Sequence, residues 1–403
     1  MKRTRQAIQF GFLALVLIGV FALKANCERW CPFGGVEALY TYATDGDMLC
    51  SLGTSNFFLL GGVLLMTLLL RRAFCGYVCP IGTISEWLHA LGRRLRMRDV
   101  RVSHATDRGL SLLKYVLLVI VLWLTWRAGE LIFRGFDPCY ALIGRHGEDI
   151  TYWAYVVSGV IVVASLVIML PFCRWFCPFA AVLNPVSRFA LTRVRRNEEV
   201  CRDCTACAKK CPMAIPVDRL ASVDVARCTS CMSCIDACPQ SDAGAISWGP
   251  SRGWGLRWSQ AGLIAVVLAC LAGATAASYV FPIPSYVRTH GTPPEQVAAV
   301  ELRIGDVRCR GRANLLLYFL ERDDIFEIPG YFKVEAWPDP EVADVRVTYD
   351  PAQADATTIK QAITEPYYDA VADYWRMSPF SIEGYDPLAL ESDAVLPPFP
   401  DTR

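Results

Sequence analysis

The chain has 403 residues, enough for two or three domains, and 54% of them are hydrophobic, with a mean hydropathy of +0.31. These values argue against a wholly soluble chain, so membrane spans are expected. The net charge of +1 conceals an asymmetry, because residues 281–403 carry 11 Lys and Arg against 21 Asp and Glu. We therefore expect the basic remainder to lie at a membrane surface and the acidic part to lie in solution.

Five apolar segments are candidates for membrane-spanning helices, which need about 20 residues. The second is short, and the third contains Lys114, whose side chain is expected to reach towards the membrane interface. The first follows a basic N-terminus, but Lys24 stands where a cleavage site prefers small residues, so we expect a retained anchor and not a signal peptide. The segments are Gln6–Leu23, Asn56–Leu70, Gly109–Trp126, Ile150–Phe172 and Trp258–Phe281.

Basic residues are concentrated in alternate loops between these segments. Residues 71–108 contain eight Arg, among them Arg71 and Arg72, and further Arg residues, beginning with Arg174, follow the fourth segment. The other two loops hold few basic residues. Because cytoplasmic loops are enriched in Lys and Arg, this pattern predicts a multi-pass protein of the inner (cytoplasmic) membrane. Its N-terminus would be cytoplasmic and its acidic C-terminal part periplasmic.

A Cys-x-x-x-Cys-Pro motif occurs three times, and each copy begins at the end of an apolar segment. Of the 18 cysteines in the chain, 14 lie in spaced motifs, which favours metal ligation over a disulfide framework. Cysteines four residues apart lie on one face of a helical turn, and the Pro suits the first turn of a new helix. The three copies begin at Cys27, Cys75 and Cys173.

The predicted orientation separates these thiols into two groups. Four fall on the cytoplasmic side and could hold a third 4Fe–4S cluster, in addition to the two predicted below: Cys75, Cys79, Cys173 and Cys177. Four fall on the opposite side and could hold another cluster or act as redox thiols: Cys27, Cys31, Cys50 and Cys139. Alternatively, Cys50 and Cys139 form a disulfide, or these cysteines are buried packing residues.

The strongest motif lies between Cys201 and Pro239, where two runs of Cys-x-x-Cys-x-x-Cys-x-x-x-Cys-Pro follow one another. In bacterial two-cluster ferredoxins the fourth Cys of each run ligates the cluster of the other run. Two zinc sites are the alternative, but zinc sites use pairs of ligands and not triplets. One predicted ligand set is Cys201, Cys204, Cys207 and Cys238, and the other is Cys228, Cys231, Cys234 and Cys211.

Other cofactors and partners have little support in the sequence. A transmembrane bis-histidine haem has no ligands, because the four histidines lie outside the five segments. No G-x-G-x-x-G motif follows a strand, so no NAD site is expected. No nucleic-acid partner is expected either. The histidines are His89, His104, His146 and His290.

The acidic part predicts a small α+β domain over residues 297–385, followed by an extended tail over 386–403. Alternating apolar residues and turn signals indicate the order strand, helix, strand, strand, helix, strand, which is that of a ferredoxin-like sandwich. The expected strands lie at 300–304, 332–336, 345–349 and 378–383, and the expected helices at 312–321 and 355–364.

The predicted fold is therefore multi-domain: an α-helical membrane bundle with five spans, an inserted two-cluster bacterial ferredoxin module and the C-terminal α+β domain. Spans bearing Cys-x-x-x-Cys-Pro followed by a double ferredoxin motif resemble the membrane polyferredoxins of the NapH, NosR and CcoG/FixG types. The resemblance covers roughly residues 1–280. The predicted domains are 1–196 (four spans), 197–250 (ferredoxin module), 256–281 (fifth span) and 297–385.

The resemblance implies that electrons pass between cytoplasmic clusters, the quinone pool and a partner across the membrane. The C-terminal domain resembles a heavy-metal-associated domain around Val307-Arg308-Cys309, although its loop holds one Cys where two are usual. Cys309 is therefore a weak candidate metal or redox residue, since Cu(I) prefers paired soft ligands.

The leading functional hypothesis is a membrane-bound iron–sulfur electron-transfer protein, with a lipid membrane, the quinone pool or a redox partner protein, and an extracytoplasmic electron acceptor or metal as its partners. Such a chain could be a quinone- or metal-linked oxidoreductase subunit. One alternative is a membrane metal-ion (cupric) reductase that uses the outer cysteines. Another is a metal-binding or transport protein whose clusters sense redox state.

Overall fold

The chain divides into two compact units, each with its own hydrophobic core. The first comprises Met1–Glu37 and Ser55–Phe281, and the second Ala38–Thr54 and Pro282–Arg403. The computed structural model describes residues 2–23, 30–45, 54–100, 102–128, 132–144, 151–251, 258–281, 283–293, 296–308, 310–321, 330–339, 341–369 and 374–386.

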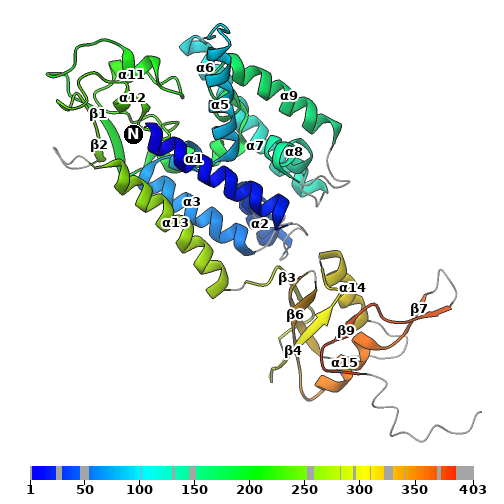
Figure 1. Cartoon of the computed structure of the whole chain (residues 1–403). Coiled ribbons are helices and arrows are strands. Elements are labelled where there is room, and N and C mark those ends of the chain that lie inside the picture. Colours follow the sequence, from blue (N-terminus) through cyan, green and yellow to red (C-terminus); the bar gives the residue numbers. More distant parts are fainter. Residues whose placement is uncertain are drawn as a thin grey trace, which may run out of the picture. The chain divides into compact units, whose positions relative to one another are not determined.

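Apolar helices form most of the first unit (Figure 1). Three stretches are long and apolar enough to cross a membrane, namely Arg3–Ala22, Ala105–Arg127 and Gln260–Val280, and two shorter apolar helices cover Ser55–Leu70 and Tyr152–Val167. All five coincide with expected spans, but the second and fourth are short. The helices are α1 (Lys2–Leu17) with its π-helical extension η1 (Ile18–Ala22), α3 (Thr54–Leu70), α6 (His104–Leu110), α7 (Leu113–Ala128), α9 (Tyr152–Val167) and α13 (Gln260–Val280).

The two short helices end at residues with left-handed backbone. Arg71 follows α3 with φ 60°, and Leu170 follows α9 with φ 51°. Non-glycine residues rarely adopt this conformation, because Cβ crowds the following carbonyl oxygen. After each of these residues the chain enters a short helical segment that carries a cysteine, α4 (Ala73–Tyr77) or η4 (Phe172–Phe176). The fourth helix already stops at Val167, where Ile168 adopts an extended backbone (φ −124°, ψ 131°), earlier than the expected span end at Phe172.

The spanning candidates expose large apolar side chains. Val119 of α7 is 66% exposed, and Val160 and Val163 of α9 are 63% and 64% exposed. Such surfaces suit contact with lipid. Lys114 of α7, by contrast, is 2% exposed, and its Nζ donates a hydrogen bond to the carbonyl oxygen of Arg174, at 3.4 Å. Lys114 is thus bonded within the protein, and its place relative to the membrane interface stays a prediction.

A proline stands at the first position of each helix that follows a cysteine motif, where its missing N–H costs nothing. Of these helices, α5 packs against α9, and α10 packs against α7. At the first of these contacts, the hydroxyls of Ser85 and Ser165 lie 2.8 Å apart. The helices that begin with Pro are α2 (Pro32–Asp45), α5 (Pro80–Arg94), α8 (Pro138–Ile143), which follows the 3₁₀ turn η3 (Ile132–Phe136), and α10 (Pro178–Arg188).

The ferredoxin module follows α10 and shares the core of the first unit. A two-stranded antiparallel sheet opens and closes it, with Val194 opposite Trp248. Figure 1 shows its strands and short helices beside the start of α1. The elements are β1 (Thr192–Arg196), α11 (Ala206–Lys209), the 3₁₀ turn η5 (Val217–Arg219), α12 (Ser233–Asp236) and β2 (Ile246–Pro250).

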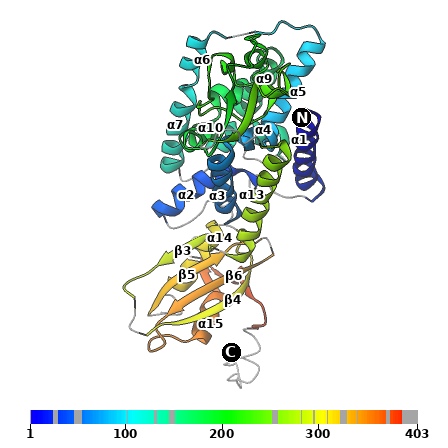
Figure 2. The ribbon, with the colours of Figure 1, turned by 90° about the vertical axis from the view of Figure 1, so that its left-hand side faces the viewer.

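The second unit contains a five-stranded antiparallel sheet in the order β3-β5-β6-β4-β9 (Figure 2). Apolar residues of its strands form a core with the two helices, and exposed charged pairs such as Arg346 with Glu301 lie on its other face. The expected element order is present, but the edge strand β3 and the β7–β8 hairpin were not expected. The elements are β3 (Tyr286–Thr289), β4 (Ala298–Gly305), α14 (Arg310–Glu321), β5 (Tyr331–Trp337), β6 (Val342–Tyr349), α15 (Ala356–Thr364), β7 (Tyr367–Asp369), β8 (Tyr374–Arg376) and β9 (Ser381–Ile382).

The packing of α5 on α9 generates a testable prediction at Gly92. A Cβ atom at this position would collide with the backbone carbonyl of Leu166, whereas one at Gly61 of α3 would meet nothing within 4 Å. We expect Gly92→Ala to destabilise the protein by about 1–3 kcal/mol, the usual cost of overpacking. Thermal unfolding in detergent, followed by circular dichroism, measures this change. The matched control Gly61→Ala should unfold no earlier than wild type, and equal losses in both variants would contradict the close approach.

Candidate metal centre

The two ferredoxin loops form two pockets, each lined by four cysteines. Three come from one loop and the fourth from the other, so the loops exchange their last cysteine. Four thiols are the donor set of a 4Fe–4S cluster, so the residues of each pocket fit that group. The first pocket contains Cys201, Cys204, Cys207 and Cys238, and the second contains Cys211, Cys228, Cys231 and Cys234.

The two loops have nearly the same backbone conformation at equivalent positions. In the first loop, Asp203 and Thr205 have φ of 47° and 59°, and in the second Ser230 and Met232 have φ of 48° and 60°. These pairs occupy the same positions relative to the first Cys of their runs. Left-handed non-glycine residues persist only where the surroundings impose them, and they cluster at functional sites. The repeated conformation therefore gives each loop the same presentation of three thiols.

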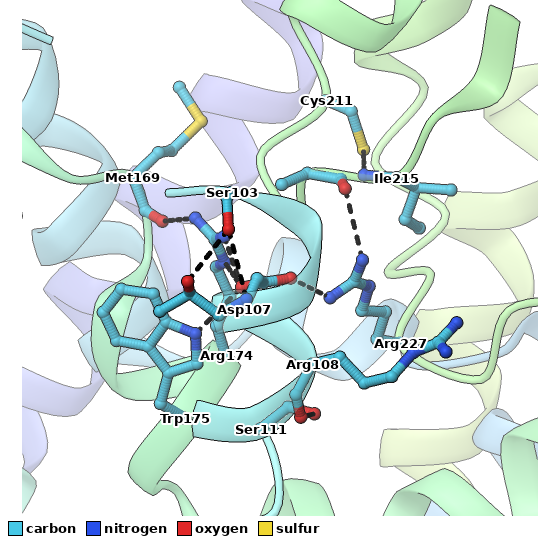
Figure 3. A network of polar contacts seen from close by, with 12 residues as sticks. Ser103, Asp107, Arg108, Ser111, Met169, Arg174, Trp175, Cys211, Ile215 and Arg227 are labelled. Atoms are coloured by element: carbon cyan, nitrogen blue, oxygen red, sulfur yellow. Dashed lines mark hydrogen bonds and ion pairs between the residues drawn. The ribbon is translucent and has the colours of Figure 1, made fainter. Parts of the chain in front are cut away.

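The second pocket holds its thiols in a water-poor setting. Cys228 and Cys234 are 8% and 9% exposed. Burial raises the pKa of Cys211 to about 12, helped by the neighbouring Cys231, although the backbone N–H of Ile215 lowers it. That N–H donates to Cys211 Sγ with an N-to-S distance of 3.5 Å (Figure 3). Thiolates at this site therefore need positive charge beside them, which iron supplies.

Another four cysteines meet between the apolar helices and the module; we call Cys75, Cys79, Cys173 and Cys177 the membrane-side set. Cys79 and Cys177 precede the prolines of α5 and α10 with nearly equal backbone angles, φ −61° and ψ 119° against φ −66° and ψ 112°. Burial raises the pKa of each to about 12, and the nearby Cys75 raises it further. Burial, Cys79 and Cys177 also raise the pKa of Cys173. The structure thus brings together the four cysteines that the sequence grouped.

The residues that follow Cys75 pack directly against the loop that forms the second pocket. A Cβ atom at Gly76 would lie 2.8 Å from the carbonyl oxygen of Thr229 and 3.6 Å from Cβ of Cys231. The Tyr77 hydroxyl donates to the carbonyl oxygen of Ser230, at 3.4 Å. Only glycine allows the residue after Cys75 to approach the second ferredoxin loop this closely. The two groups of thiols are therefore separated by a few directly packed residues.

A buried carboxylate also ties the turn that carries Cys173 to the second ferredoxin loop (Figure 3). Asp107 of α6 accepts hydrogen bonds from Arg174 Nε, at 3.1 Å, and from Trp175 Nε1, at 2.9 Å. Its other oxygen accepts from Arg227, which stands next to Cys228. The Asp107 side chain is 2% exposed. One carboxylate thus joins α6, the turn that carries Cys173 and the second ferredoxin loop.

The sequence offered no sign of the buried roles of these arginines. Arg71, Arg72 and Arg174 were interpreted as cytoplasmic loop charges, yet they are 0%, 0% and 6% exposed. Their proximity to cysteine motifs was the only available signal. The predicted cytoplasmic side of these loops therefore depends on their exposed arginines, such as Arg93 and Arg94.

The cysteines expected on the outer side are only partly described. Cys31 precedes α2, and burial raises its pKa, with Asp137 as the next cause. Cys139 lies in α8 and packs against the apolar cluster that also contacts Cys79 and Cys177. The other thiols of the outer group, Cys27 and Cys50, lie outside the described residues, as does Cys309, on which the metal-reductase alternative partly depends.

The Asp107 network predicts a large loss of stability on neutralisation. Asp107→Asn would leave the buried guanidinium of Arg174 and the half-buried one of Arg227 without their counter-charge. Breaking a buried ion pair costs about 3–5 kcal/mol. We expect Asp107→Asn to lower the thermal unfolding temperature of the detergent-solubilised protein markedly. Asp242→Asn, a change at an exposed Asp of the same module, should leave it unchanged. Equal stability of both variants would contradict the network.

Family models match the parts of the chain that carry the cysteines. A "4Fe-4S binding domain" matches residues 52–98 and 150–197, which include the whole membrane-side set. A "4Fe-4S dicluster domain" matches residues 193–239, which include all eight ferredoxin cysteines. Both kinds of site therefore lie in recognised iron–sulfur domains. No solved structure matches the chain.

Curated relatives agree with these domains. YccM of Escherichia coli is 34% identical over 54% of this chain and 62% of its own length. The ferredoxin-type protein NapH of Escherichia coli is 28% identical over 59% of this chain and 85% of its own length. The regulatory protein NosR of Pseudomonas aeruginosa is 29% identical over 41% of this chain and 23% of its own length. The chain thus spans about six-tenths of YccM. With these matches, its 4Fe–4S domains and its apolar helices, the chain resembles the membrane polyferredoxins of the NapH and NosR type.

Proposed function

We propose that this chain passes single electrons between two 4Fe–4S clusters in the ferredoxin module and a third cluster held by the membrane-side set. The observation that carries the proposal is the direct packing of Gly76 against the second ferredoxin loop, at the Thr229 carbonyl oxygen and Cβ of Cys231. Packed protein between two redox groups keeps them close and excludes water. The clusters supply the one-electron chemistry, and the protein supplies ligands, spacing and electrostatics.

Under this proposal each pocket of the module holds one cluster and the membrane-side set holds another. The N–H groups directed at the sulfurs support ligation, since hydrogen bonds to sulfur stabilise the negative charge of cluster ligands. For Cys79 these donors are the backbone N–H groups of Gly82 and Ile81, and for Cys177 the donor is that of Ala180. The equivalent placement of Cys79 and Cys177 before two prolines supports one site built from two similar helix starts.

A line of aromatic rings supports an onward path towards the outer cysteines. The Phe74 and Phe179 ring centroids lie 6.0 Å apart, those of Phe179 and Phe33 lie 6.5 Å apart, and those of Phe33 and Phe133 lie 4.9 Å apart. Phe74 adjoins Cys75, and Phe33 lies two residues after Cys31. We propose that electrons leave the membrane-side cluster along this line for a quinone or an extracytoplasmic acceptor.

The membrane arrangement is part of the proposal. Helices α3 and α9 would complete a five-span bundle in the inner membrane, and the neighbouring protein would cover their short ends. The basic loops favour a cytoplasmic ferredoxin module, which would place the acidic second unit in the periplasm. Its strand order, with β4 between β6 and β9, supports a ferredoxin-like sandwich extended by β3.

Iron and acid-labile sulfide in the anaerobically purified chain, together with electron paramagnetic resonance of the reduced state, test the proposal. Since each cubane holds about four irons, we expect about twelve per wild-type chain. Cys173→Ala should retain about eight, because one ligand of the membrane-side set is lost. The matched control Cys270→Ala, a change in α13 outside every motif, should retain about twelve.

About eight irons in wild type would contradict the third cluster and leave only the ferredoxin pair. Equal iron in wild type and Cys173→Ala would contradict the assigned ligand set. A loss of iron in Cys270→Ala equal to that in Cys173→Ala would show that the loss is not specific to the motif.

A further inference from the structure

The membrane-side set has a fully buried cation beside it. Arg72 is 0% exposed, and its Nη2 lies 3.6 Å from Cys75 Sγ. Nη1 donates to Asn184 Oδ1, at 3.3 Å, and Asn184 is held in turn by a hydrogen bond to the Tyr115 hydroxyl, at 2.8 Å. The guanidinium is therefore oriented by Asn184 and directed at a thiol.

Within the described part of the chain, Arg72 has no carboxylate partner, and its buried Nε has no hydrogen-bond partner. A buried guanidinium without a counter-charge costs several kcal/mol, so an anion is expected beside it. The neighbouring groups that favour its charged form are Cys75, Cys177 and Cys173. A 4Fe–4S cluster held by four thiolates is a net anion, and its reduction adds a further negative charge.

The adjacent arginine makes the contrast clear. Arg71 is also 0% exposed, but its Nε donates to the carbonyl oxygen of Thr192, at 3.0 Å, and its Nη1 donates to that of Val225, at 3.1 Å. Its Nη2 lies 3.8 Å from Asp224. Arg71 therefore has partners within the protein, whereas the surroundings of Arg72 are mainly the thiols of the membrane-side set.

Arg72 also contacts the second ferredoxin loop. Its backbone N–H donates to the carbonyl oxygen of Cys228, at 3.3 Å. One residue therefore links a cysteine of the second pocket, through its backbone, to a cysteine of the membrane-side set, through its side chain. Lys114 adds a second buried cation within electrostatic reach of Cys177 and Arg72.

We propose that Arg72 sets the reduction potential of the membrane-side cluster and makes it the acceptor for electrons from the ferredoxin pair. Burial disfavours the more highly charged reduced cluster, and the guanidinium offsets this effect because it attracts the reduced form more strongly than the oxidised form. In the transfer, a ferredoxin cluster is oxidised by one electron and the membrane-side cluster is reduced by one, and no bond is made or broken. This inference rests on the proposed third cluster.

An anaerobic redox titration of the full chain, followed by electron paramagnetic resonance, tests the inference. The step that disappears in Cys173→Ala identifies the membrane-side cluster. In Arg72→Gln this step should move to lower potential by at least a tenfold change in equilibrium constant, about 59 mV for one electron. Arg72→Lys keeps the charge, so its shift should be clearly smaller.

The matched control is Arg71→Gln, which removes an equally buried charge one residue away. It should shift the reduction potential of a ferredoxin cluster and leave that of the membrane-side cluster within about threefold of wild type in equilibrium constant. The reason is that the cysteine acting electrostatically on Arg71 is Cys228. If Arg72→Gln fails to retain iron, Arg72→Lys decides the question, because it keeps the charge but not the guanidinium geometry. Its membrane-side step should shift by less than tenfold but by more than that of Arg71→Gln, and a shift no larger than that of Arg71→Gln would overturn the inference.

Three further results would overturn the inference. With about twelve irons present, an unshifted membrane-side step in Arg72→Gln would reject the role of Arg72 while leaving the proposed electron transfer intact. Equal shifts in Arg72→Gln and Arg71→Gln would reject its specificity. About eight irons in wild type would reject the third cluster itself, and with it both the proposed function and this inference.

Discussion

The close approach of Gly76 to the Thr229 carbonyl is the contact on which the rest of the first unit depends. It sets the residue after Cys75 directly on the loop that carries Cys228 and Cys231. A side chain at this position would separate the two groups of thiols, and the proposed electron transfer depends on their proximity. Glycine is required here for space, since its φ is not in the left-handed range.

Buried charge holds this junction in one arrangement. Arg174 and Arg227 share the carboxylate of Asp107, Arg71 is satisfied mainly by backbone carbonyls, and Arg72 faces thiols. Buried charges contribute little net stability, but a misplaced one is costly, so such networks favour a single geometry over alternatives. Of these arginines, Arg72 also places positive charge beside a membrane-side thiol. Under the proposed role of Arg72, structure and redox tuning are linked at one place.

The sequence predicted most of the local chemistry and little of the tertiary electrostatics. Cysteine spacing grouped the thiols of both pockets, because ligand spacing is a local property of loops. The predicted membrane orientation of the motifs grouped the membrane-side set. Proline after cysteine correctly predicted where α5 and α10 begin. The burial of Lys114 within the protein was not predicted, since burial depends on which helices pack together. The end of α9 was placed too late, because the apolar run continues past Ile168, where the backbone becomes extended. The edge strand β3 was missed, since a short strand carries little periodicity.

The most direct test of the account is the fate of an electron given to the ferredoxin pair. Flash photoreduction of the purified full chain, with freeze-quench electron paramagnetic resonance, would follow it in wild type and in Cys173→Ala. The account predicts that in wild type the ferredoxin signal decays as a separate membrane-side signal rises, and that in the variant the ferredoxin signal persists. Identical decay in both proteins, with no second signal in wild type, would contradict an electron path from the module into the membrane.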